Sequence, residues 1–261
     1  MCRLFAFSFQ VETIENKRAE YLNSFRNLSV EGRVLNRMFP GHEDGWGAAI
    51  YTKGETVPSV YKSVASAFGD GDFKNVKVFK NGMPQTGIAH LRKKTVGDAS
   101  LVNTHPFVDG VYSFAHNGTV SEGLYEELAS RCEGGTDSER LFRKFLTIKE
   151  KGGLSTHDAY KEMLVETKKS YPSYSAINTI LHDGDSLYVS RLINTEHCNP
   201  LYSRDEVEEY YSLFLGKTKE GDNFVSSEKI CSEDVVYKLI PNNTFCVINL
   251  KTGQEECTTL A

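Results

Sequence analysis

The second residue of the chain could perform nucleophilic chemistry with little help from other side chains. The sequence begins MCRLFAFSF, and Cys2 is small enough for an aminopeptidase to remove the methionine before it. Cys2 would then carry both a thiol and a free α-amino group, whose pKa in the unperturbed state is about 7.7–8.0. Such a residue is a nucleophile that brings its own base. The alternative is a small buried hydrophobic residue, a common role for cysteine.

Four other short stretches are too polar and too rich in glycine to be explained as core. They are HEDGWG (42–47), HLRKKTVG (90–97), NTHPF with FAHNGTV (103–120) and GGTDSE (134–139). Within them, Asn117 and Gly118 offer a side-chain amide and a backbone N–H, the donors that an oxyanion intermediate needs. The same dipeptide is also a favoured hairpin turn, so the pair alone does not decide between the two roles.

Together these motifs resemble the class II glutamine amidotransferases, which are N-terminal-nucleophile (Ntn) hydrolases. The order M-C, D-G-W-G, T-H-P-F, A-H-N-G and T-D-S-E is most similar to the small stand-alone members of that family. The resemblance runs from Cys2 to about Leu146 through these motifs and is looser beyond. It implies an α+β fold, the four-layer αββα sandwich of the Ntn hydrolases, in a single domain over residues 1–261.

The resemblance also implies a reaction. Cys2, once Met1 is removed, would attack the side-chain amide of glutamine and release ammonia through a γ-glutamyl thioester, with Asn117 and Gly118 as the oxyanion hole. No metal or organic cofactor would be needed. The chain carries no synthetase domain, so a partner subunit could accept the ammonia. Two alternatives remain: a hydrolase of γ-glutamyl peptides or conjugates, and a catalytically silent regulatory subunit.

Four further residues would bind the substrate if the family pattern holds. Arg92 would bind the α-carboxylate and Asp137 the α-ammonium group, pairings that suit a bidentate guanidinium and a carboxylate. Thr95 would help to hold the carboxylate end, and His105 would line the site. Larger family members often have histidine where this chain has Val96. Arg92 could instead form a surface ion pair, Asp137 could favour a helix start, and His105 could be structural.

Composition argues against several other classes of protein. The net charge of −5 gives no sign of the basic patch that a nucleic-acid-binding protein needs. The apolar segment 4–11 is too short for a membrane span, and no small-residue cleavage site follows it, so a cytoplasmic location without membrane contact is expected. The six cysteines and seven histidines show no metal-ligand spacing, so no metal site is expected. Because cysteine is sparse in a long chain without a secretory signal, reduced thiols are expected.

The elements that must position these residues fall along the chain as strands, then two helices, then more strands. This order indicates α+β layers. Thr136 and Glu139 have capping-box spacing and predict the start of one helix. A second helix is expected over 155–169, before Tyr171-Pro172. The segment 199–223 has no pattern that assigns it.

Alternating and apolar runs predict the strands. LFAFSF (4–9) is expected to be a core strand directly after Cys2. Two hairpins are expected, with turns at Lys53-Gly54 and Asp183-Gly184. Further strands are expected in TGIAHLRKK (86–94), GVYSFAHNGTV (110–120), FVSSEKI (224–230), VVYKLI (235–240) and TFCVINL (244–250), the last followed by a turn at 252–253.

Overall fold

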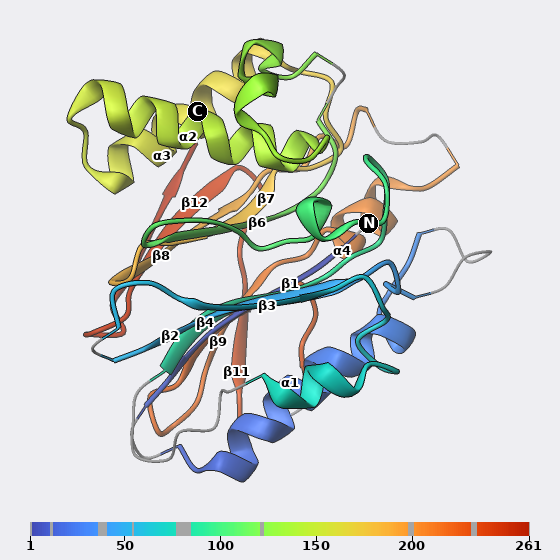
Figure 1. Cartoon of the computed structure of the whole chain (residues 1–261), viewed down its shortest axis with the longest axis vertical. Helices are drawn as coiled ribbons and strands as arrows, with labels where there is room; N and C mark the ends of the chain where they lie inside the picture. The colour runs from blue at the N-terminus through green and yellow to red at the C-terminus, as the bar shows by residue number, and fades with distance from the viewer. Residues whose placement is uncertain are drawn as a thin grey trace.

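The computed structural model consists of two antiparallel sheets stacked face to face, with helices on the outer face of each (Figure 1). It describes residues 2–10, 13–35, 41–53, 55–76, 85–120, 123–197, 201–230 and 234–260. The layers follow one another as α, β, β and α. The predicted four-layer αββα sandwich is therefore confirmed.

The first sheet has seven strands in the order β11-β9-β10-β1-β4-β2-β3. The strands are β1 (Arg3–Phe9), β2 (Trp46–Thr52), β3 (Ser59–Ser63), β4 (Gln85–Leu91), β9 (Phe214–Lys217), β10 (Asn223–Ser226) and β11 (Val236–Leu239). β1 is the central strand, and it pairs with β4 through Leu4 opposite His90 and with β10 through Phe5 opposite Ser226. The residue before β1, Cys2, is thus held at one end of the sheet.

The second sheet has six strands in the order β13-β12-β8-β7-β6-β5. The strands are β5 (Phe107–Asp109), β6 (Tyr112–Asn117), β7 (Asn178–His182), β8 (Ser186–Arg191), β12 (Thr244–Asn249) and β13 (Glu255–Thr259). Small and branched side chains fill the space between the sheets, among them Ala6, Ile88, Ala115 and Ile180. Small side chains at this interface let the two sheets approach closely, which brings the end of β6 near the start of β1.

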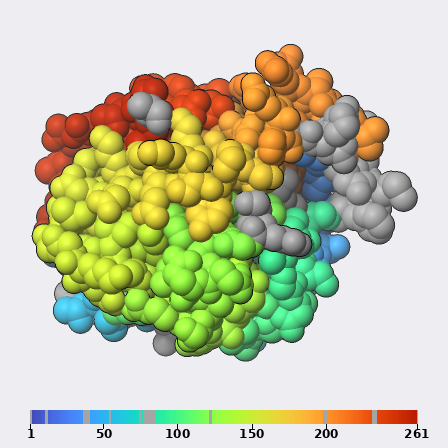
Figure 2. All heavy atoms as spheres, turned by 90° about the horizontal axis from the view of Figure 1, so that it is seen from above, coloured from blue at the N-terminus to red at the C-terminus, as the bar shows by residue number. Residues whose placement is uncertain are grey.

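Helices cover the outer faces. On the first sheet lies α1 (Glu15–Glu31), and on the second lie α2 (Asp137–Gly152) and α3 (Thr156–Ser170). Figure 2 shows the green and yellow residues of this helical layer covering one face of the molecule. Aromatic contacts join each layer to its sheet: Phe25 stacks on Phe5 with 5.1 Å between ring centroids, and Phe142 stacks on Phe114 at 5.6 Å. The remaining helices are α4 (Arg204–Tyr210) and the short 3₁₀ turns η1 (Gly71–Asn75), η2 (Leu101–Asn103) and η3 (Glu126–Arg131).

Most of the expected elements are present, and several others were not foreseen. The helix after Thr136, the helix before Tyr171 and the hairpin at Asp183-Gly184 are all confirmed. The first expected hairpin pairs β2 with β3, although Gly54 of its turn lies outside the described residues. The order of two helices between strands is incomplete, because α1 follows β1 directly. The unassigned segment contains α4 and β9, and a final strand, β13, follows the turn at 252–253.

The expectation of reduced thiols is wrong for one pair of cysteines. Cys246 on β12 and Cys257 on β13 form a disulfide, because the antiparallel register places these two residues directly opposite each other. Cys2 and Cys132 are the free thiols among the described residues. Cys198 and Cys231 lie outside them. In the part of the chain that the structure describes, no helix is both long enough and apolar enough to span a membrane.

Candidate active site

Cys2 lies at the start of the central strand, between the ends of both sheets. Its backbone nitrogen donates to Oδ1 of Asn117 at 3.0 Å, and its Sγ is 3.4 Å from the backbone nitrogen of Lys93. Burial raises the pKa of the Cys2 thiol, and the Lys93 N–H together with the charges of Arg92 and Arg3 offsets only part of this rise. The thiol therefore remains protonated near neutral pH and needs a base before it can attack.

Asn117 is the last residue of β6 in the second sheet, and its side chain extends to Cys2, directly before β1 of the first sheet. Its side chain is fully buried, and Nδ2 has no hydrogen-bond partner among the described residues. Buried amide donors without a partner are rare in native proteins. The carboxamide that accepts a hydrogen bond from the Cys2 nitrogen thus has an N–H donor available for another partner.

The next residue, Gly118, occupies a position where only glycine fits. Its φ is +156°, and a Cβ atom would lie 1.8 Å from the carbonyl oxygen of Ala176. The close approach of two backbone segments therefore excludes any side chain at this position. The alternative reading of Asn117-Gly118 as the turn of a two-residue hairpin is wrong, because Asn117 is the last residue of β6 and is paired with Asn178 of β7.

Arg3 fixes the carbonyl side of Cys2, a role that the sequence reasoning missed. The guanidinium is fully buried, donates from Nη1 to the Cys2 carbonyl at 2.9 Å, and forms a 2.5 Å ion pair with Glu228 through Nε. It also donates to the carbonyl of Arg33 and lies 4.7 Å from the centroid of the Tyr210 ring. A charged residue at the start of an otherwise apolar strand was the available signal.

Arg92 follows β4 and organises the loop that comes after it. The side chain is 3% exposed, donating from Nη1 to the Asp98 carbonyl at 2.7 Å and from Nη2 to the Val96 carbonyl at 3.2 Å. The surface ion pair considered as an alternative is therefore wrong for this residue. Thr95, in the same loop, is exposed and accepts a hydrogen bond from the Thr119 hydroxyl at 3.3 Å.

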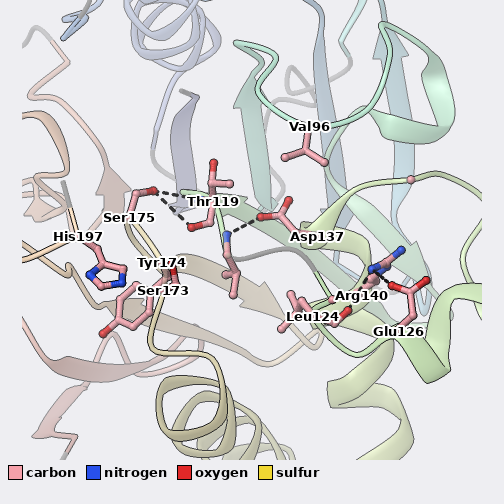
Figure 3. A pocket seen from close by; sticks show the side chains of 13 residues that line it. Val96, Thr119, Leu124, Glu126, Asp137, Arg140, Ser173, Tyr174, Ser175 and His197 are labelled. Carbon is pink, nitrogen blue, oxygen red and sulfur yellow. Dashed lines mark hydrogen bonds and ion pairs between the residues drawn. The ribbon is translucent and has the colours of Figure 1, made fainter. Parts of the chain in front are cut away.

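Asp137 is the first residue of α2 and borders an open cavity (Figure 3). Its Oδ2 accepts from the backbone nitrogen of Val120 at 2.8 Å, and its Oδ1 accepts from that of Ser138 at 2.9 Å. The cavity has a volume of about 620 Å³ and mixes carboxylate, hydroxyl, imidazole and apolar groups. Its labelled side chains are Val96, Thr119, Leu124, Glu126, Asp137, Arg140, Ser173, Tyr174, Ser175 and His197.

His105 is buried away from this cavity. Its ring lies 4.2 Å from the His90 ring, measured between centroids, and neither of its nitrogens has a hydrogen-bond partner among the described residues. Burial lowers the pKa of His105 well below its ordinary value, so the ring is neutral at pH 7. His105, which was expected to line the site, is not among the residues that line this cavity.

The expected site residues thus form two joined groups. Cys2, Asn117 and Gly118 meet at the facing ends of β1 and β6. The two residues that follow Gly118 connect this group to Thr95 and Asp137. The Thr119 hydroxyl donates to Thr95, and the backbone nitrogen of Val120 donates to Asp137. Among the residues that the structure describes, no three metal-binding side chains cluster.

Comparison with known proteins identifies a matching family model and several relatives in sequence. Residues 1–202 match the family model described as "Glutamine amidotransferases class-II". The "Probable glutamine amidotransferase DUG3" of Saccharomyces cerevisiae is 24% identical, covering 97% of this chain and 83% of its own. An uncharacterized protein of Methanocaldococcus jannaschii is 28% identical, and the chain spans 66% of its length.

Solved structures share the same fold. The glutamine phosphoribosylpyrophosphate amidotransferase of B. subtilis aligns over 100% of this chain and 49% of its own, with a TM-score of 0.66 and 15% identity. A glutamine aminotransferase class-II domain protein from Silicibacter pomeroyi aligns over 100% of both chains, with a TM-score of 0.58 and 17% identity. At these identities the likeness concerns the fold.

Proposed function

Because the chain belongs to the class II glutamine amidotransferase family, we propose that it hydrolyses the side-chain amide of glutamine with Cys2 as the nucleophile. After Met1 is removed, the Cys2 nitrogen is a free amine that takes the thiol proton. Sγ then attacks the amide carbon, the amine returns the proton to the leaving nitrogen, and ammonia departs. Water hydrolyses the remaining γ-glutamyl thioester to glutamate and the free thiol.

The observation that carries this proposal is the position of the Asn117 carboxamide. Oδ1 holds the Cys2 nitrogen at 3.0 Å, and Nδ2 is buried without a partner among the described residues. A donor kept in this state costs stability in the resting protein. It becomes useful when the carbonyl oxygen of the substrate gains negative charge, since a preorganised donor then stabilises the intermediate. The backbone N–H of Gly118 is proposed as the second donor.

The α-amino acid end of the substrate is proposed to lie between Arg92 and Asp137. Two hydrogen bonds to the Asp137 carboxylate come from backbone N–H groups, which leaves lone pairs for an ammonium group. Arg92 has five N–H donors, of which the backbone carbonyls of the loop take two. Thr95 supports the carboxylate end of the substrate in this proposal.

The second candidate substrate is a γ-glutamyl peptide or conjugate. The cavity beside Asp137 holds about 620 Å³, which is more room than free glutamine requires. The same thiol chemistry would release an amine instead of ammonia. For the glutamine reaction we propose that any ammonia acceptor is a separate partner subunit, and that the protein acts in the cytoplasm.

The test is covalent labelling of the Met-free protein with a diazoketone analogue of glutamine, followed by intact-mass measurement. One adduct is expected, absent in Cys2→Ala, retained in Cys132→Ala and blocked by excess glutamine. Cys132 is the matched control because it is the other free thiol of the described chain. Faster turnover of a γ-glutamyl dipeptide than of glutamine would select the second substrate. Protein that is neither labelled nor active on either compound would refute the proposal and favour a silent regulatory subunit.

A further inference from the structure

Asn103 is a buried residue that lies between two loops. One follows β4 and contains Arg92, and the other precedes α2, which begins at Asp137. Asn103 is the last residue of η2, and its side chain is 2% exposed. On one side, Oδ1 accepts from the backbone nitrogen of Gly135 at 2.9 Å. On the other, Nδ2 donates to Oδ1 of Asp98 at 2.5 Å and to the Asp98 carbonyl at 3.3 Å. A single carboxamide thus bridges the loop after β4 and the loop before α2.

Both loops close tightly on this carboxamide. A Cβ atom on Gly134 would lie 2.2 Å from Asn103 Oδ1, and one on Gly97 would lie 2.9 Å from Asn103 Nδ2. Gly97 also has a φ of +73°, which disfavours any other residue. The two glycines therefore allow the loops to approach Asn103 from opposite sides.

The bridge connects the two groups that are proposed to recognise an α-amino acid. The Asp98 carbonyl accepts from Arg92 Nη1 as well as from Asn103. Gly135, held on the other side, lies two residues before Asp137. The path from the guanidinium to the carboxylate thus passes through one hydrogen-bonded side chain.

We infer that Asn103 is a positioning residue that sets the separation of Arg92 and Asp137 and thereby selects substrates carrying both α-substituents. This inference rests on the proposed function. Asparagine suits the position because it must accept a hydrogen bond from one loop and donate to the other. Aspartate keeps the acceptor for Gly135 but sets a second carboxylate oxygen against the Asp98 carboxylate.

The experiment compares Asn103→Asp with the wild type in glutamine hydrolysis. Loss of a hydrogen bond to a charged group should raise KM for glutamine by about 10- to 100-fold. kcat should change far less, because Asn103 does not contact Cys2. Glutaramate, which lacks the α-ammonium group, serves as the second substrate. The wild type should prefer glutamine to glutaramate, and the variant should show a smaller preference.

Two controls separate positioning from general damage. Alkylation of Cys2 by iodoacetamide, which has no α-substituents, should proceed at the wild-type rate in the variant. Asn242→Asp is the matched substitution, because the Asn242 carboxamide also accepts through Oδ1 and donates through Nδ2, here from the backbone nitrogen and to the carbonyl of Ile193. It should leave KM and the preference between substrates unchanged.

Each outcome is decisive. An active wild type with an Asn103→Asp variant of unchanged KM and unchanged preference would overturn the positioning role alone. A variant whose iodoacetamide reactivity falls in parallel with its glutaminase activity would overturn it too, since the damage would then reach Cys2. A Met-free wild type that hydrolyses neither glutamine nor a γ-glutamyl dipeptide would overturn the proposed function and this inference together.

Discussion

Replacing His182 with glutamine should remove part of the sensitivity of the protein to acid. His182 ends β7 at the end of the sandwich away from Cys2, fully buried, with its ring stacked on Tyr51 at 3.7 Å between centroids. Nδ1 accepts from the backbone nitrogen of Gly184 at 2.8 Å, and Nε2 lies 2.7 Å from the Thr86 hydroxyl. Because Nδ1 is an acceptor, the ring is neutral with its proton on Nε2. A second proton would break the bond to Gly184.

The expected magnitude follows from the pKa of the buried ring. Burial lowers the pKa of His182 to about 3, whereas an unfolded chain gives about 6.5. The unfolded state therefore binds the proton more readily, so this contribution to stability is complete above pH 6.5 or so and declines as the pH falls toward 3. At pH 5, about 1.5 units below the unfolded pKa, the loss from this one residue is about 2 kcal/mol.

Urea unfolding followed by circular dichroism at pH 7.5 and pH 5.0 measures this loss. Other groups also titrate over this range, so the relevant quantity is the difference between proteins in how much stability they lose. His182→Gln should lose about 2 kcal/mol less than the wild type. Equal losses in the His182 variant and the wild type would refute burial of this ring as the source.

Two predictions concern the oxyanion donors. Asn117→Asp keeps an acceptor for the Cys2 nitrogen but removes the unpartnered donor, and kcat should fall by about 100- to 1,000-fold; a steady-state assay giving kcat within about 5-fold of the wild type would contradict this role. Gly118→Ala places a Cβ 1.8 Å from the Ala176 carbonyl and should lower the free energy of unfolding by more than about 1 kcal/mol, measured in urea; unchanged stability would show that these segments separate freely.

Regular patterns made much of the fold predictable. The helix that begins after Thr136 was expected from Thr136 and Glu139, yet only half of the capping box forms. Thr136 accepts from the Glu139 nitrogen at 3.2 Å, as expected. The Glu139 carboxylate turns away and accepts from the backbone nitrogens of Glu133 and Gly134 at 2.9 and 2.8 Å. Spacing in the sequence predicted the helix start. It did not predict which backbone N–H groups would donate to the Glu139 carboxylate.

The helix α1 was missed although a periodic pattern was present. Tyr21, Leu22 and Phe25 are buried at helical spacing and pack on the first sheet. Two features made the helix hard to recognise from the sequence. No side chain caps its start at Ile14, and charged residues surround the apolar positions. Arg18 even lies on the buried face, where its guanidinium donates from Nη1 to Oε1 of Gln85, 67 positions away, as well as to two nearby backbone carbonyls. Tertiary partners of this kind cannot be read from local pattern.

The candidate site divides in the same way. The motifs and their resemblance to a known family were enough to propose Cys2, Asn117 and Asp137, because the proposed chemistry depends on which atoms they carry. The supporting contacts of Arg3 and Asn103 include residues that are distant in the chain: Glu228 is 225 positions from Arg3, and Gly135 is 32 positions from Asn103. Only the folded arrangement brings these groups together.

The central place of β1 has a consequence for the order of events during synthesis. One neighbour of β1 is β4, but the other is β10, whose Ser226 pairs with Phe5. A growing chain cannot complete this sheet until most of its residues have left the ribosome, since such long-range pairing forms late. Until then the amino terminus has no fixed place, and the enzymes that trim methionine can reach it. A nascent chain released before β10 would lack Glu228 as well, so the Arg3–Glu228 ion pair beside Cys2 can form only after residue 228 has been synthesised.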